Sequence, residues 1–155
     1  MRRTLITAFI SIFLVACGEQ STTPAPAQLA PTPPQKPTAM FDVPSIAGKV
    51  EEQVAAALGE PNSCENITQG KKCFYQPGET EVVFISGKAD WITINALDNA
   101  PYSEDALPLL GLEKASASFS NNFVTRWSEI PGLLEVSIFP AQGHVDYAYI
   151  KTATP

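Results

Sequence analysis

The sequence predicts an α+β fold in which two tandem helix-plus-antiparallel-hairpin repeats form a sheet with the helices packed on one face. Three observations lead to this prediction. Apolar residues at helical spacing open the globular part of the chain, alternating apolar and polar residues follow them, and the same order of features then recurs. The globular domain is expected over residues 41–152, with repeats at about 41–98 and 102–152.

The first expected element is a helix in "SIAGKVEEQVAAALGEP". From Val50 to Leu58 the apolar residues recur at i, i+4, i+7 and i+8, which places them on one face of a helix. Gly59 and Pro61 directly after them are typical of a helix C-terminus. A single helix of about two turns is therefore expected before the first strand.

Three segments with alternating apolar and polar residues come next: "KKCFYQ", "TEVVFIS" and "ADWITINA". They are separated by Pro77-Gly78 and by Ser86-Gly87-Lys88, and both separators have the residues of tight turns. The pattern predicts antiparallel strands joined by short connections.

The second half repeats this order, because "PGETEVVFISGKADWITI" is answered by "PGLLEVSIFPAQGHVDYAYI". Seven residues are identical between the halves: Pro77, Gly78, Glu81, Val82, Gly87, Asp90 and Ile94 match Pro131, Gly132, Glu135, Val136, Gly143, Asp146 and Ile150. The offset is 54 up to the valines and 56 beyond Gly87, which predicts a second hairpin loop two residues longer than the first. The second helix, "SEDALPLL", is expected to be short or kinked at Pro108. The alternative is that any two antiparallel hairpins look alike.

The N-terminus has the features of an export signal. Arg2 and Arg3 precede an apolar run from Leu5 to Ala16, whose 12 residues are too few to cross a bilayer and fit a signal peptide. The run ends in Leu14-Val15-Ala16-Cys17, which resembles the lipobox of bacterial lipoproteins. That resemblance implies removal of residues 1–16 and acylation of Cys17 with palmitate or similar chains; the alternative is an ordinary signal peptide with a chance cysteine.

The lipobox resemblance also implies a location. Two or three acyl chains bind a membrane stably. Gly18, rather than aspartate, follows the cysteine, which by resemblance to enterobacterial lipoproteins implies sorting to the outer membrane. Residues 17–40 hold 6 of the 14 prolines and no aromatic residue, so a disordered proline-rich tether is expected behind the anchor. The domain is thus expected to face the periplasm at a distance from the bacterial outer membrane.

Charge and cysteine content limit the partners. Removing residues 1–16 leaves 8 basic and 16 acidic side chains, and this net negative charge argues against a nucleic-acid partner. Cys64 and Cys73 are an even pair in an exported chain, which predicts a disulfide. A zinc site would need further ligands, and the chain has one histidine, so we expect no metal and no other cofactor.

The segment "GKVEEQVAAALGEP", residues 48–61, resembles the G-M-T-x-x-x-V-x-x-x-L-G-x-P signature of the BamE/SmpA outer-membrane lipoproteins. Gly48, Val54, Leu58, Gly59 and Pro61 match it, whereas Lys49 and Val50 replace its Met-Thr. A tandem of such units is similar to the beta-lactamase inhibitory proteins. The resemblance implies a protein-binding role in envelope assembly or, alternatively, inhibition of a secreted or periplasmic enzyme.

An enzymatic function is not expected. His144, the single histidine, lies beside Gly143 in an expected turn, and no nucleophile elbow, phosphate-binding loop or zinc motif is present. The candidate binding residues are instead Trp91, Tyr147 and Tyr149, which alternate with the aliphatic residues of the expected strands.

If the aliphatic residues pack on the helices, these three aromatics form an exposed face that binds another envelope protein. Two alternatives stay open: the aromatics are the core and the sheet is flipped, or the face binds a small ligand or glycan.

Overall fold

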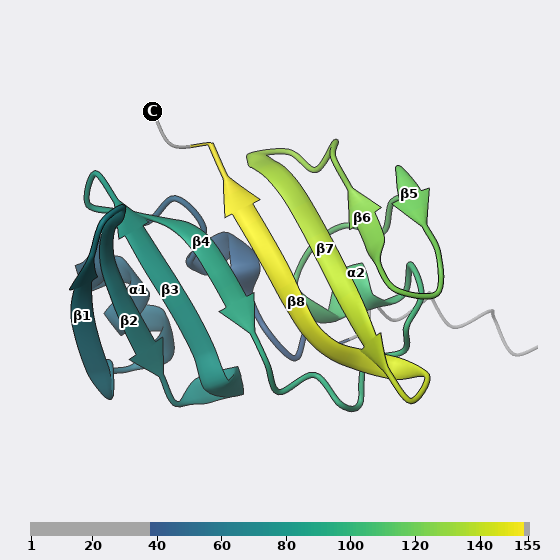
Figure 1. Cartoon of the computed structure of the whole chain (residues 1–155), viewed down its shortest axis with the longest axis horizontal. Helices are drawn as coiled ribbons and strands as arrows, with labels where there is room; N and C mark the ends of the chain where they lie inside the picture. The colour runs from purple at the N-terminus through teal and green to yellow at the C-terminus, as the bar shows by residue number, and fades with distance from the viewer. Residues whose placement is uncertain (1–37, 154–155) are drawn as a thin grey trace, which may run out of the picture. The chain divides into compact units, whose positions relative to one another are not determined.

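The computed structural model describes residues 38–153, which form eight strands, two α-helices and two 3₁₀ turns (Figure 1). The strands are β1 (Ser63–Ile67), β2 (Gly70–Tyr75), β3 (Thr80–Ile85), β4 (Lys88–Ile94), β5 (Phe119–Ser120), β6 (Thr125–Trp127), β7 (Leu133–Ala141) and β8 (His144–Thr152). They make one antiparallel sheet in the order β1-β2-β3-β4-β8-β7-β6-β5. The helices are α1 (Glu51–Leu58) and α2 (Ala106–Leu109), and the 3₁₀ turns are η1 (Val43–Ser45) and η2 (Pro77–Glu79).

The expected α+β class is wrong, because the described residues are mostly sheet and their two α-helices are only eight and four residues long. Irregular chain supplies much of the cover on the core side, where the buried residues include Ile46, Leu97 and Leu112. Two sequence features keep the helices short. Gly59 has a positive φ of 83° directly after α1, a backbone conformation that favours glycine, and Pro108 lies within α2.

The first helix is oriented differently from the sequence prediction. Val54 and Leu58 are buried, but Val50 and Ala57 are exposed. Val50 is the N-cap residue, and its side chain cannot accept a hydrogen bond. The side-chain oxygen of Gln53 accepts the Val50 N–H instead, at 3.3 Å. The start of the helix is thus capped without the hydroxyl that usually fills this position.

Each half of the sheet is a four-stranded meander rather than the expected hairpin. The first meander runs from β1 to β4, the second runs from β5 to β8, and the last strands of the two lie side by side in the middle of the sheet (Figure 1). The alternating segments of the sequence correspond to β2, β3, β4, β7 and β8. β1, β5 and β6 went unpredicted, because β1 is polar and the other two have only two and three residues.

The two meanders are related by the register of the central strand pair. Ile92 pairs with Ile150, and Ile94 pairs with Ala148. The β8 counterpart of a β4 residue has a number higher by 56, so Ala148 is the counterpart of Ile92 and Ile150 is the counterpart of Ile94. Replacing each residue by its counterpart therefore turns one pair into the other. Thr93 pairs with Tyr149, which is its own counterpart at the same spacing. The two halves therefore meet about a local pseudo-two-fold axis that passes through the Thr93–Tyr149 pair.

The prediction of a longer second hairpin loop is also wrong. Ser86-Gly87 and Gln142-Gly143 are both two-residue turns with positive φ at both positions. The extra residues lie in the strands: β7 and β8 have nine residues each, against six and seven in β3 and β4. Equivalent β-bulges stay at equivalent places, because the register skips Asp90 in β4 and Asp146 in β8. The register of the strand pairs therefore gives the same spacing of 56 between equivalent residues of the two hairpins throughout their length.

The core lies on one side of the sheet. Val82, Ile92, Ile94, Ala148 and Ile150 are completely buried on it. The largest buried side chains stand at matching places of the two meanders: Tyr75 ends β2 and Trp127 ends β6. Their neighbours in the sheet are also the matching residues Thr80 and Val136. Both halves therefore close their core with one large aromatic residue on the strand next to the outermost one.

Candidate interaction surface

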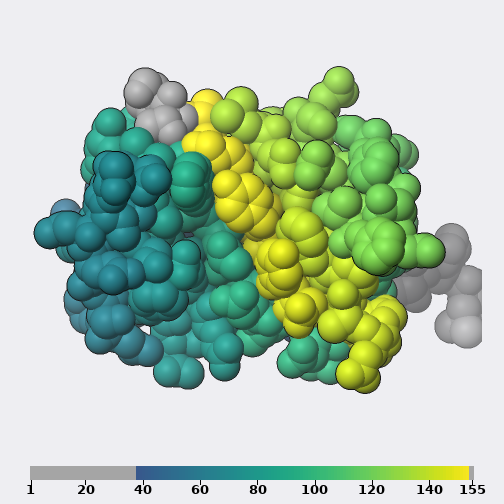
Figure 2. Space-filling model, viewed as in Figure 1, coloured from purple at the N-terminus to yellow at the C-terminus, as the bar shows by residue number. Residues whose placement is uncertain are grey.

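The side of the sheet opposite the core carries Trp91, Tyr147 and Tyr149, and we call this side the open face. Each of these residues alternates with a completely buried neighbour, and each is itself half-buried. The structure therefore brings the three sequence-predicted residues to one surface and places the aliphatic residues in the core. Figure 2 shows this surface, with β8 crossing its middle between β4 and β7.

Three phenylalanines belong to the same face and were missed in the sequence. Phe139 pairs with Tyr147 in the sheet, and the two rings stack with centroids 4.4 Å apart. Phe74 and Phe119 lie on the strands near the two edges and are 38% and 51% exposed. The open face thus has aromatic side chains on five of its eight strands.

One continuous row of side chains crosses seven strands of this face. The paired residues in the row are Phe74, Glu81, Thr93, Tyr149, Ser137, Arg126 and Phe119. Strand spacing makes the row roughly 30 Å long. Trp91 and Tyr147 lie on opposite sides of its centre and are equivalent about the pseudo-two-fold axis. The surface is therefore about as long as a standard protein–protein interface.

The cations of the open face are held by its acids. Lys72 Nζ lies 2.9 Å from Glu65 and 3.8 Å from Glu81, and the hydrogen bond to Glu65 raises the pKa of Lys72. Lys72 also lies over the ring of Phe74, at 5.2 Å from its centroid. The first half of the face thus has its lysine fixed between two carboxylates and an aromatic ring.

In the second half, Arg126 Nε lies 3.2 Å from Glu135 Oε1 and donates a hydrogen bond to Ser137 Oγ at 3.2 Å. The Ser137 hydroxyl donates in turn to Glu135, at 2.7 Å. Side chains that are already fixed by such contacts lose little conformational entropy when a partner binds.

Trp91 lies at the centre of this arrangement. Lys151 forms an ion pair with the buried Asp90, and its ammonium lies 5.4 Å from the centroid of the Trp91 ring. Within the described residues the buried indole N–H of Trp91 has no hydrogen-bond acceptor. Close by, burial raises the pKa of the Tyr149 hydroxyl, and the charges of Glu135 and Asp90 raise it further. Both central aromatics are thus packed into the face rather than standing free in solvent.

The predicted disulfide between Cys64 and Cys73 is confirmed. The two cysteines are direct partners in the β1–β2 register, with their Cα atoms 4.1 Å apart. In the second meander the corresponding pair is Ser120 and Thr125, whose hydroxyls form a hydrogen bond at 2.8 Å. The first meander therefore has a covalent bond where the second has a hydrogen bond.

Cys17, the signal peptide and the tether up to residue 37 lie outside the described residues. Neither helix of the described part is long and apolar enough to cross a bilayer. His144 is exposed at the first position of β8. Comparison of the chain with known protein families, curated proteins and solved structures found no significant match.

Proposed function

We propose that this chain is a lipid-anchored, periplasm-facing module that binds another protein of the cell envelope through the open face of its sheet. The lipobox-like sequence before Cys17 supports the anchor, and the proline-rich segment behind it supports a tether. In this proposal the chain assembles or scaffolds an envelope complex and does not catalyse a reaction.

One observation carries the proposed binding function: aromatic side chains gather on the sheet face that does not form the core. Large amphipathic rings are the side chains that contribute most at protein interfaces, especially where neighbouring contacts exclude water. Stacking between Phe139 and Tyr147 and the cation–π contacts of Lys72 and Lys151 fix the rings before a partner arrives. A surface ordered in this way is suited to rigid docking of a protein.

The charge of the chain supports a protein partner over a nucleic acid. Eight basic and 16 acidic side chains remain after removal of residues 1–16. On the open face the cations Lys72, Arg126 and Lys151 all form ion pairs with acidic residues of this chain. Such a face offers little positive potential to phosphate groups. Apolar and aromatic side chains of a partner are its natural complement.

Site-specific photo-crosslinking in living bacteria tests this proposal. A photoreactive phenylalanine analogue is placed at Phe74 or Phe119, and Ala56, an exposed residue of α1, serves as the control position. We expect both open-face positions to crosslink to the same envelope protein and the control position not to do so. Equal crosslinking from all three positions, or none from either phenylalanine, would contradict the proposal.

The identity of the captured protein separates the two binding roles. An integral or lipid-anchored envelope protein supports the scaffold role, whereas a soluble secreted or periplasmic enzyme supports the inhibitor role. The anchor is tested separately with Cys17→Ser, which should abolish incorporation of labelled palmitate and release the chain from membrane fractions. Failure of the wild-type chain to incorporate palmitate would refute the anchor and leave the open face untouched.

A further inference from the structure

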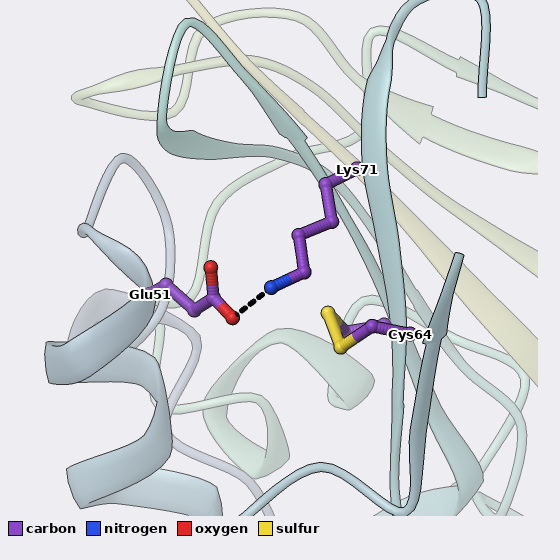
Figure 3. The surroundings of a disulfide bond; sticks show 4 residues. Glu51, Cys64 and Lys71 are labelled. Carbon is purple, nitrogen blue, oxygen red and sulfur yellow. Dashed lines mark hydrogen bonds and ion pairs between the residues drawn. A yellow bond between two sulfur atoms is a disulfide. The ribbon is translucent and has the colours of Figure 1, made fainter. Parts of the chain in front are cut away.

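A second group of residues, on the core side of the first meander, has the chemistry of a metal site. Glu51 begins α1, Cys64 lies in β1 and Cys73 lies in β2. One carboxylate oxygen and the two sulfur atoms all lie within 4.8 Å of one another. Figure 3 shows the Glu51 carboxylate and the disulfide side by side, with the Lys71 ammonium reaching the carboxylate.

We infer that the reduced form of this protein binds one Zn²⁺ ion through Cys64, Cys73 and Glu51. Two thiolates and a carboxylate are ligands that Zn²⁺ accepts, and a water molecule can complete the four-coordinate shell. Around a tetrahedral zinc ion, ligand atoms at about 2.0–2.3 Å from the metal lie roughly 3.3–3.8 Å from one another. The three atoms therefore need only small side-chain movements to reach this spacing once the sulfur–sulfur bond is broken.

Reduction and metal binding convert the disulfide form into the zinc form in two steps. A dithiol or phosphine reductant supplies two electrons, two protons are taken up, and the disulfide becomes two thiols. Zn²⁺ then displaces those two protons and binds the two thiolates and the Glu51 carboxylate. Metal binding and the disulfide are thus alternative states of the same cysteines.

Lys71 provides the electrostatic link between the states. In the disulfide form its ammonium forms an ion pair with Glu51. The Lys71 side chain is 39% exposed, so it can turn to solvent when a divalent cation takes its place beside the carboxylate. Removing the lysine charge should therefore favour the metal.

The second meander shows that this fold does not require cysteines at these positions. Ser120 and Thr125 occupy the equivalent places and hold the outer strands together by a hydrogen bond. The outer strands of the second meander are thus paired at this place without a covalent bond. Figure 3 also shows that the sulfur atoms lie on the side of the strands that faces α1, where the carboxylate is.

The test uses purified protein that has been reduced under anaerobic conditions, freed of reductant and titrated with Co²⁺ alone. We expect one Co²⁺ per chain with the intense visible bands of tetrahedral coordination and a thiolate-to-cobalt charge-transfer band. Zn²⁺ should displace the cobalt and remove these bands, and the disulfide form should show neither. If the reduced chain loses its circular dichroism spectrum, one equivalent of Zn²⁺ should restore it.

Variants show which residues bind the metal. Glu51→Gln should weaken Zn²⁺ binding by more than the roughly 10–100-fold that loss of an outer-shell partner causes. Lys71→Gln should strengthen binding, and the matched control Glu52→Gln, on the same turn of α1, should leave it unchanged. A reduced protein that shows no tetrahedral cobalt spectrum, or stays unfolded with excess Zn²⁺, would overturn the inference. So would Glu51→Gln protein with unchanged affinity.

Discussion

Thr93 and Tyr149 face each other across the central strand pair, and each occupies in its own half the position that the other occupies in the second half. Both side chains lie on the open face, midway between Trp91 and Tyr147. The centre of the candidate interaction surface therefore coincides with the local pseudo-two-fold axis of the sheet. Its two sides are similar in position but differ in chemistry, because tryptophan stands on one side and a stacked tyrosine on the other.

The first prediction compares the two tryptophans of the chain, one on each side of the sheet. Trp127 is 1% exposed and donates its indole N–H to the carbonyl of Ala115, whereas Trp91 is half-buried on the open face. Trp127→Ala should lower the free energy of unfolding by about 3–5 kcal/mol. Trp91→Ala should lower it by about 1–2 kcal/mol and weaken partner binding by about 2 kcal/mol or more.

Urea unfolding of both variants measures the first effect, and binding to the crosslinked partner measures the second. Tyr147→Ala is the matched variant on the other side of the axis and should behave like Trp91→Ala. Equal destabilisation by Trp91→Ala and Trp127→Ala would mean that the open face is a second core.

Local sequence patterns were sufficient for the longer strands and for the end of the first helix. Alternation along β4 and β8 correctly separated the buried aliphatic residues from the aromatic ones, since successive side chains of a strand point to opposite faces. Gly59 correctly marked the end of α1. Each of these features depends on residues that are close together in the chain.

Features that depend on contacts between distant segments could not be predicted from local sequence patterns. The sequence alignment of the repeats made Val136 the counterpart of Val82. In the sheet, Val82 pairs with Ile92, and the β8 counterpart of Ile92, Ala148, pairs with Ile138. The structural counterpart of Val82 is therefore Ile138, two positions further on. Such a slip keeps every side chain on its face and is therefore invisible in the pattern. Phe119 lies in β5, which like β1 and β6 is too polar or too short to show alternation. Phe74 lies in the predicted strand β2, and its alternation with the buried Cys73 and Tyr75 is a signal that could have placed it on the open face.

The second prediction concerns the bonds that hold the outer strands. Reduction of Cys64–Cys73, or Cys64→Ala with Cys73→Ala, should lower the free energy of unfolding by roughly 2–3 kcal/mol, because a closed loop of this length restricts the unfolded chain by about that amount. Ser120→Ala, at the equivalent place, should cost only about 0.5–1.5 kcal/mol, the net contribution of one hydrogen bond. Urea unfolding with and without reductant gives both values. Similar costs at the two places would contradict the expected difference between the covalent bond and the hydrogen bond.

The third prediction concerns two glycines with different constraints. Gly87 has φ 79° in an open turn, so Gly87→Ala should cost about 1 kcal/mol of unfolding free energy through backbone conformation alone. Gly143→Ala, in the equivalent turn with φ 86°, should cost about the same.

Gly70 differs from both. A Cβ atom there would lie 2.0 Å from the backbone oxygen of Phe84, so Gly70→Ala should displace β2 from β3 and cost more than the other two together. Thermal melts rank the three variants. A Gly70→Ala protein as stable as the turn variants would contradict a close approach of β2 and β3 at Gly70.

The last prediction concerns Tyr75, which is 2% exposed and whose hydroxyl has no hydrogen-bond partner among the described residues. Burial raises the pKa of Tyr75 to about 12, and the charges of Glu51 and Glu60 contribute to the shift. Because a buried hydroxyl without a partner has lost its hydration, Tyr75→Phe should raise the free energy of unfolding at neutral pH by about 1 kcal/mol.

The same residue should respond to alkaline pH. An unfolded tyrosine loses its proton near pH 10, whereas Tyr75 keeps its proton in the folded chain until about pH 12. Between these values the folded state binds more protons than the unfolded state, so the free energy of unfolding falls as the pH rises, by at most about 1.4 kcal/mol per pH unit. Tyr75→Phe protein lacks this loss, and its advantage over wild type should grow from about pH 10 upward. Urea unfolding of Tyr75→Phe and wild-type protein at stepped alkaline pH measures the difference. An advantage of Tyr75→Phe that stays constant with pH would show that this hydroxyl titrates as an exposed one does.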